Sequence, residues 1–184
     1  MKPNEFVEKY LSAAQSVERE TGIPAVAILA QAALESGWGG SVIGNNFFGI
    51  KFKKGDPGFR RFLTTEYSDD RFKFRGQDVK EVRLDRTTGK YVFKIYQYFA
   101  EYPTPEAGFK AHTRLLLSDR YKHALRWKHS PKRFLIAVWR AGYATDPNYG
   151  KKICQMVDSV VRRLPVRQTT FMPPPMKPIT DFRL

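Results

Sequence analysis

At 184 residues, of which 42% are hydrophobic, the chain is long enough to bury one sizeable core, and its length favours a single domain. No run of about eighteen or more apolar residues occurs, which excludes a predicted membrane-spanning helix. The formal net charge of +14 predicts a polyanionic partner, and charge alone does not decide between an anionic wall polymer, an acidic lipid and a nucleic acid.

The N-terminal part predicts two helices in succession. Residues 4–20 place Phe6, Tyr10 and Val17 on one apolar stripe, with charged residues available for the opposite face. Gly22 suits the end of this helix and Pro24 the start of the next.

Glu35 is the residue around which we expect a functional site. Helix formers from residue 25 to 36 place Ile28 and Glu35 on one helical face, and Gly37 ends the helix. A carboxyl in the last turn meets the partial negative charge of unpaired carbonyls, and the adjacent Trp38 excludes water. Both effects raise a carboxyl pKa, as a proton donor near neutral pH requires. The alternative is an ordinary solvated helix residue, which the apolar neighbours and following glycines disfavour.

The middle of the chain changes pattern. Residues 45–51 lack a helical period, and their Asn and Gly residues favour an ordered loop beside the end of the second helix. Between Phe59 and Phe99, two alternating segments predict a small antiparallel hairpin lobe, with a turn at residues 87–90. Residues 71–86 are too polar for a buried strand, and we expect an exposed, mobile ribbon there.

Three further helices are predicted in the C-terminal half. Thr104-Pro105 and Ser130-Pro131 are start signals, and Asp146-Pro147 caps the last helix, which stops before Pro165. We therefore expect one domain at residues 1–165 and a proline-rich extended tail at residues 166–184. The tail is a candidate docking segment for an envelope-machine or secretion partner.

Four motifs occur in a set order: Ala33-Leu34-Glu35-Ser36-Gly37-Trp38-Gly39, Asn46-Phe47-Phe48-Gly49-Ile50-Lys51, Thr64-Thr65-Glu66-Tyr67 and Ala141-Gly142-Tyr143-Ala144-Thr145-Asp146-Pro147. Together they resemble glycoside hydrolase family 73, the peptidoglycan N-acetylglucosaminidases that include flagellar muralytic enzymes. The resemblance implies an α+β fold: a mainly helical, lysozyme-like domain with a small antiparallel β-hairpin lobe.

The resemblance also implies an activity. The chain is expected to be a bacteriolytic peptidoglycan hydrolase that cleaves the β-1,4 glycosidic bond after N-acetylglucosamine in the bacterial cell wall, with Glu35 as general acid. Glu66 matches the acid of the third motif and is our preferred second carboxylate. The other candidates are Asp69, Asp70 and Glu81.

Five residues are expected to bind substrate. The resemblance places Asn46 and Phe48 in the lining of the cleft and assigns Tyr143 to its support. Trp38 is expected to exclude water beside Glu35, and Tyr149 to lie at the cleft rim or in the packing. A carboxyl separation near ~5 Å predicts retention and one above ~6.5 Å predicts inversion; a third route uses the 2-acetamido group of the substrate. The sequence leaves these mechanisms open.

We expect no metal and no cofactor, because His112, His123 and His129 have no ligand spacing and Cys154 is the single cysteine. The expected partners are peptidoglycan glycan strands. Nucleic acid is not expected, because no reader motif accompanies the charge. The second hypothesis is a non-catalytic glycan-binding module of an envelope-spanning machine.

The expected place of action is the cell wall or periplasm. The first residues show no Sec-type signal peptide, which leaves three export routes open: a trimmed mature chain, a dedicated secretion apparatus, or release of a phage lysin.

Overall fold

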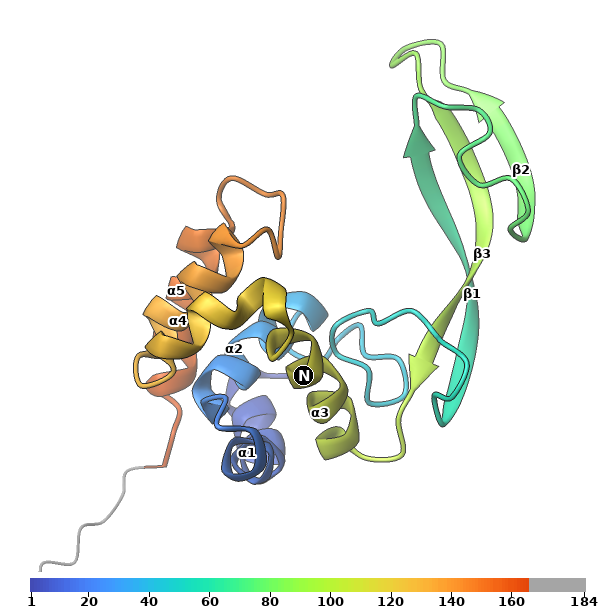
Figure 1. Cartoon of the computed structure of the whole chain (residues 1–184). Coiled ribbons are helices and arrows are strands. Elements are labelled where there is room, and N and C mark those ends of the chain that lie inside the picture. The colour runs from blue at the N-terminus through green and yellow to red at the C-terminus, as the bar shows by residue number, and fades with distance from the viewer. Residues whose placement is uncertain (166–184) are drawn as a thin grey trace, which may run out of the picture.

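The computed structural model describes residues 1–165, and the predicted tail lies outside the described residues. Within this range the elements run in the order α1 (Pro3–Thr21), α2 (Ala25–Ser36), β1 (Gly58–Ser68), β2 (Val79–Leu84), β3 (Tyr91–Glu101), α3 (Pro105–Leu116), the 3₁₀ helix η1 (Asp119–Trp127), α4 (Pro131–Arg140) and α5 (Tyr149–Val161). The helices pack into one helical body, and residues 58–101 form a β arm that projects from it (Figure 1).

Helix α2 is the centre of the helical body. It is apolar on most of its surface, and nine of its residues are buried: Ala25, Ala27, Ile28, Leu29, Ala30, Gln31, Ala32, Ala33 and Ser36. A helix that is apolar all round is stable only when other helices cover it. Helices α1, α4 and α5 contact α2, which explains why its short side chains, mostly alanine, lie at the crossing points.

The end of α2 follows from its glycines. Gly37 adopts the left-handed conformation at φ 56°, and its N–H donates to the carbonyl of Ala33. Trp38 continues with φ 57°, so the chain turns sharply directly after the helix. Glu35 therefore lies in the last turn, as predicted.

The three later α-helices begin with proline or close to one. Thr104 accepts a hydrogen bond from the N–H of Ala107 at 3.2 Å, which is the predicted cap of α3. Pro131 is the first residue of α4, and α5 begins at Tyr149, two residues after Pro147. No helix in the described part is long and apolar enough to cross a membrane.

The β arm confirms the predicted antiparallel lobe and adds a strand to it. The strand order is β1-β3-β2, and both outer strands pair antiparallel with β3. The third strand, β2, lies in the polar segment 71–86, which we expected to be a ribbon outside the hairpin. It is exposed over almost its whole length, and its three apolar residues, Val79, Val82 and Leu84, stand among charged ones, so the segment reads as a polar surface segment rather than as a strand.

Candidate active site

Glu35 lies on the last turn of α2 with partial access to solvent. The residue as a whole is exposed, but protein atoms around its carboxyl remove part of its hydration, and this desolvation raises its pKa. A hydrogen bond from the Tyr149 hydroxyl to Oε1, at 3.2 Å, acts in the opposite direction and lowers the pKa. Burial is the larger effect, so Glu35 holds a proton at a higher pH than an ordinary glutamate.

Three buried or nearly buried side chains form a hydrogen-bonded chain behind this carboxyl. His112 Nε2 lies 3.1 Å from Gln31 Oε1, and Gln31 Nε2 donates to the Tyr149 hydroxyl at 3.3 Å. Burial lowers the pKa of His112 to about 3, so its ring is neutral at physiological pH. Because the Gln31 amide oxygen only accepts, the geometry assigns the His112 proton to Nε2. Because the Tyr149 hydroxyl oxygen accepts from Gln31, its own proton is free to donate to Glu35.

Aromatic rings pack around these hydrogen-bonded side chains. Phe48 stacks on His112 with ring centroids 3.7 Å apart, and Tyr143 lies 5.8 Å from His112 and 5.7 Å from Tyr149. Burial is the main cause that raises the pKa of both tyrosines, with the nearby Glu35 charge adding to it, so both hydroxyls stay protonated. Tyr143 and Tyr149 thus lie near Glu35, and Phe48 lies against His112 behind them. That these rings line a substrate cleft stays a prediction.

Asn46 is buried, and its amide is fully used by the backbone. Its Nδ2 donates to the carbonyls of Ile50 and Ala100, both at 2.9 Å. Its Oδ1 accepts from the N–H groups of Phe48 and Ile50, at 3.3 and 3.0 Å. The side chain joins the loop to β3 and has no donor left for a sugar. It determines where Phe48 lies rather than presenting an amide to the cleft.

Trp38 lies on another side of the α2 end. Its ring packs edge-on against Phe6 of α1, with centroids 5.6 Å apart, and the Arg163 guanidinium lies 5.6 Å from the ring centroid. These contacts connect the turn after α2 to α1 and to the end of α5. A substrate-binding role for Trp38 stays a prediction.

Glu66 lies on β1 of the β arm and is half-buried. Gln97 Nε2 on the adjacent strand β3 donates to its Oε1 at 2.9 Å, and the Thr64 hydroxyl lies 3.4 Å from the same atom. Burial lowers the pKa of Lys51, and the nearby Glu66 charge opposes this effect. Among the described residues, no hydrogen bond or ion pair connects Glu66 to Glu35.

The sequence did not reveal that Gln31 and His112 belong to the site. Gln31 precedes Glu35 by one helical turn and is a polar residue in an apolar helix, which is a usable signal. His112 is 81 residues away from Gln31 and has no local signal at all. For metals, residues 1–165 contain no group of three or more His, Cys, Asp or Glu residues arranged to hold an ion.

Comparison with known proteins identifies the family of this chain. The family model Glucosaminidase, described as mannosyl-glycoprotein endo-beta-N-acetylglucosaminidase, matches residues 11–161. The peptidoglycan hydrolase FlgJ of Pseudomonas aeruginosa is 36% identical over 161 residues, which cover 83% of this chain and 36% of that protein. FlgJ of Escherichia coli K12 is 31% identical over 163 residues, covering 84% of this chain and 46% of that protein. The chain therefore spans less than half the length of these relatives.

A solved structure shows the same fold. A C-terminally truncated glycoside hydrolase domain of FlgJ from Salmonella typhimurium superposes with a TM-score of 0.67 at 27% sequence identity. The match covers 88% of this chain and 99% of that domain. It confirms the predicted α+β, lysozyme-like fold class.

Proposed function

Because this chain belongs to the glucosaminidase family of glycoside hydrolases, as its four ordered motifs predicted, we propose that it is a peptidoglycan hydrolase. It cleaves the β-1,4 glycosidic bond after N-acetylglucosamine, and Glu35 is the general acid. The observation that carries this proposal is the series of buried side-chain hydrogen bonds that links His112, Gln31 and Tyr149. It ends at the Glu35 carboxyl, whose pKa is raised. Relatives named peptidoglycan hydrolases support the choice of substrate.

The proton transfer follows from the two oxygens of Glu35. Oε1 accepts from Tyr149, whereas Oε2 makes no hydrogen bond within residues 1–165. The proton therefore resides on Oε2 and passes to the oxygen of the leaving sugar as the glycosidic bond breaks. Tyr149 then stabilises the carboxylate that forms, because its hydroxyl is already directed at Oε1 by Gln31.

The second carboxylate in this proposal is Glu66. On the opposite face of the sugar it acts as nucleophile, as base for a water, or as a stabiliser while the 2-acetamido group of the substrate attacks the anomeric carbon. Gln97 and Thr64 orient its Oε1, which leaves Oε2 for the sugar or water. Asp69, Asp70 and Glu81 also belong to the β arm and stay the alternatives.

The remaining predicted residues have distinct proposed roles. Phe48 and Tyr143 present ring surface to the sugar beside Glu35, Tyr149 positions the acid, and Asn46 positions Phe48. With glycan strands as substrate, the proposed place of action is the cell wall or periplasm. The Pro-rich segment 166–184 remains the candidate docking segment for an envelope partner.

Mass spectrometry of digested peptidoglycan tests this function. Wild-type protein is expected to release fragments with N-acetylglucosamine at the reducing end, and Glu35→Gln to release almost none. Glu18→Gln, an exposed acid on α1, is the matched control and is expected to retain full activity. Reducing-end muramic acid would overturn the bond assignment. Binding of wild-type protein to sacculi without any new reducing ends would favour the glycan-binding module.

A further inference from the structure

A concave surface lies between η1 and α4, and Glu35 is not among the residues that line it. It has a volume of about 600 Å³ and is lined by His123, Arg126, Trp127, Lys132, Arg133, Ile136, Ala137, Arg140 and Ala141. We call it the η1–α4 groove. None of the residues proposed for catalysis lines it, and its volume lies in the range of ligand sites.

The charge of the η1–α4 groove is one-sided. Its lining includes three arginines and a lysine but no aspartate or glutamate. Lys132 pairs with Asp158 of α5, whereas Arg126, Arg133 and Arg140 take part in no ion pair within residues 1–165. Three exposed guanidiniums thus share one hollow without a counter-charge.

Trp127 brings two of these guanidiniums together. The central guanidinium carbon of Arg133 lies 5.1 Å from the indole centroid, and that of Arg126 lies 5.9 Å from it. The aromatic ring attracts each cation, but the two cations repel one another. An anion between them relieves this repulsion. The arrangement therefore favours a ligand with negative charge at this point.

We propose that the η1–α4 groove binds the phosphate groups of a flexible, linear anionic polymer. A guanidinium presents a planar fork of donors that matches phosphate oxygens, and a phosphate has enough oxygens to bridge two such forks. Ile136 and Ala137 provide apolar surface for the carbon atoms between successive phosphates. A polymer with several phosphates also contacts Arg140, whereas a single small anion between Arg126 and Arg133 leaves Arg140 without a partner.

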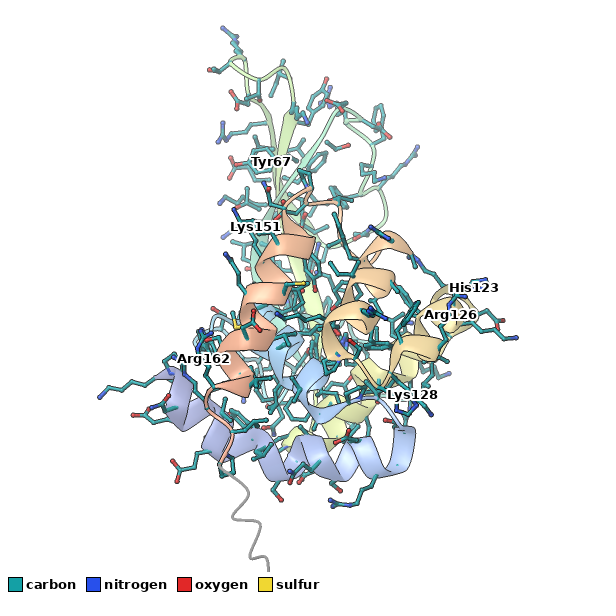
Figure 2. The ribbon with its side chains drawn as sticks, turned by 90° about the vertical axis from the view of Figure 1, so that its left-hand side faces the viewer. Tyr67, His123, Arg126, Lys128, Lys151 and Arg162 are labelled. Atoms are coloured by element: carbon teal, nitrogen blue, oxygen red, sulfur yellow. The ribbon has the colours of Figure 1, made fainter. Side chains whose placement is uncertain are left out.

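The η1–α4 groove and the proposed active site share no lining residue. Figure 2 shows His123 and Arg126 at one edge of the body, with Lys151 of α5 and Arg162, which follows α5, toward the other. The inference therefore does not depend on the proposed catalytic function, and binding and hydrolysis are measured separately.

Isothermal titration calorimetry with a synthetic poly(glycerol phosphate) oligomer tests the proposal on the full chain. The groove variant is R126Q/R133Q/R140Q, and the matched control is K80Q/R83Q/R86Q, which removes the same charge from exposed positions on the β arm. At an ionic strength of about 0.15 M, the groove variant is expected to bind about tenfold more weakly or worse, and the control within about twofold of wild type. The single variant R133Q is expected to show an intermediate loss.

Three results would overturn the assignment. Equal weakening of the groove variant and the arm control would show that only net charge matters. Equally tight binding of poly-glutamate with the same number of charges, lost in the groove variant, would make an acidic peptide the ligand. Equally tight binding of duplex DNA, lost in the same variant, would make a nucleic acid the ligand. Melting curves of each variant, followed by circular dichroism, verify that the fold is retained.

Discussion

The helical body and the β arm hold the two proposed catalytic carboxyls in contrasting ways. Glu35 is positioned by Tyr149, Gln31 and His112, which are buried among helices packed on α2. Glu66 is positioned by Gln97 and Thr64 on two paired strands of an arm that projects from the body (Figure 1). The proton donor therefore has a fixed environment, whereas the distance to its partner depends on the position of the arm.

Core packing differs just as much between the two regions. Phe47 in the body is 2% exposed and contacts the rings of Phe6, Tyr10 and Phe109. On the arm, Phe72 is 67% exposed, and the two outer strands are exposed over most of their length. Stability is thus concentrated in the part that carries Glu35.

The largest expected effect is the loss of the Phe47 ring. Phe47→Ala opens a cavity in the aromatic cluster and is expected to lower the free energy of unfolding by about 3–5 kcal/mol. Phe72→Ala is the matched change on the arm and is expected to alter it by about 0.5 kcal/mol or less. Urea denaturation of both variants measures the contrast, and equal losses would contradict it.

The next largest effect is on how the free energy of unfolding of the helical body depends on pH. His112 has an ordinary pKa of 6.5 that burial lowers to about 3, so in this range protons bind the unfolded chain more readily than the folded one. Its contribution to stability is therefore present above pH 6.5 and is lost as the pH falls from 6.5 toward about 3.

We expect His112→Gln to flatten the decrease in unfolding free energy between neutral and acidic pH. Urea denaturation of wild type and variant at several pH values measures this slope. The control is the variant His123→Gln, which changes an exposed histidine on η1. This variant is expected to have the same slope as wild type. Identical slopes for wild type and His112→Gln would contradict the account of His112 as a buried neutral group.

The smallest effect is a shift in pH dependence at the active site. The hydrogen bond from Tyr149 lowers the pKa of Glu35, so Tyr149→Phe raises that pKa further. Glu35 then keeps its proton to a higher pH, and the alkaline limb of the kcat profile moves upward. Tyr67→Phe is the control, because Tyr67 lies on the arm and is 61% exposed. A downward shift in Tyr149→Phe would show that Tyr149 does not stabilise the carboxylate.

The features that the sequence predicts well are those set by local signals. Gly37, Thr104 and Pro131 are local signals that end or begin helices, so the bounds of α2, α3 and α4 follow closely from them. The strands β1 and β3 are rich in aromatic and β-branched residues, which favour strands and predict the lobe.

Other features depend on contacts that no local pattern records. Strand β2 is exposed, half of its residues are charged, and it pairs with β3 at the edge of the sheet. The hydrogen bond from Gln31 to Tyr149 joins residues 118 positions apart, and it forms only because α5 packs on α2. Glu35 is thus predictable as an acid at a helix end, while the side chains that position it are not.

The central claim is that Glu35 donates a proton to the leaving group, and a substrate that needs no such proton tests it most directly. A dinitrophenyl glycoside of chitotetraose has a leaving group that departs as a stable anion. On sacculi, Glu35→Gln is expected to lose about 10³-fold in rate, within the range for removal of a general acid.

On the dinitrophenyl glycoside, Glu35→Gln is expected to approach the wild-type rate, whereas Glu66→Gln is expected to be slow on both substrates. Comparison of the two variants on the two substrates therefore separates the roles of the two carboxyls. A Glu35→Gln variant that is equally impaired on sacculi and on the activated glycoside would contradict the assignment of Glu35 as proton donor.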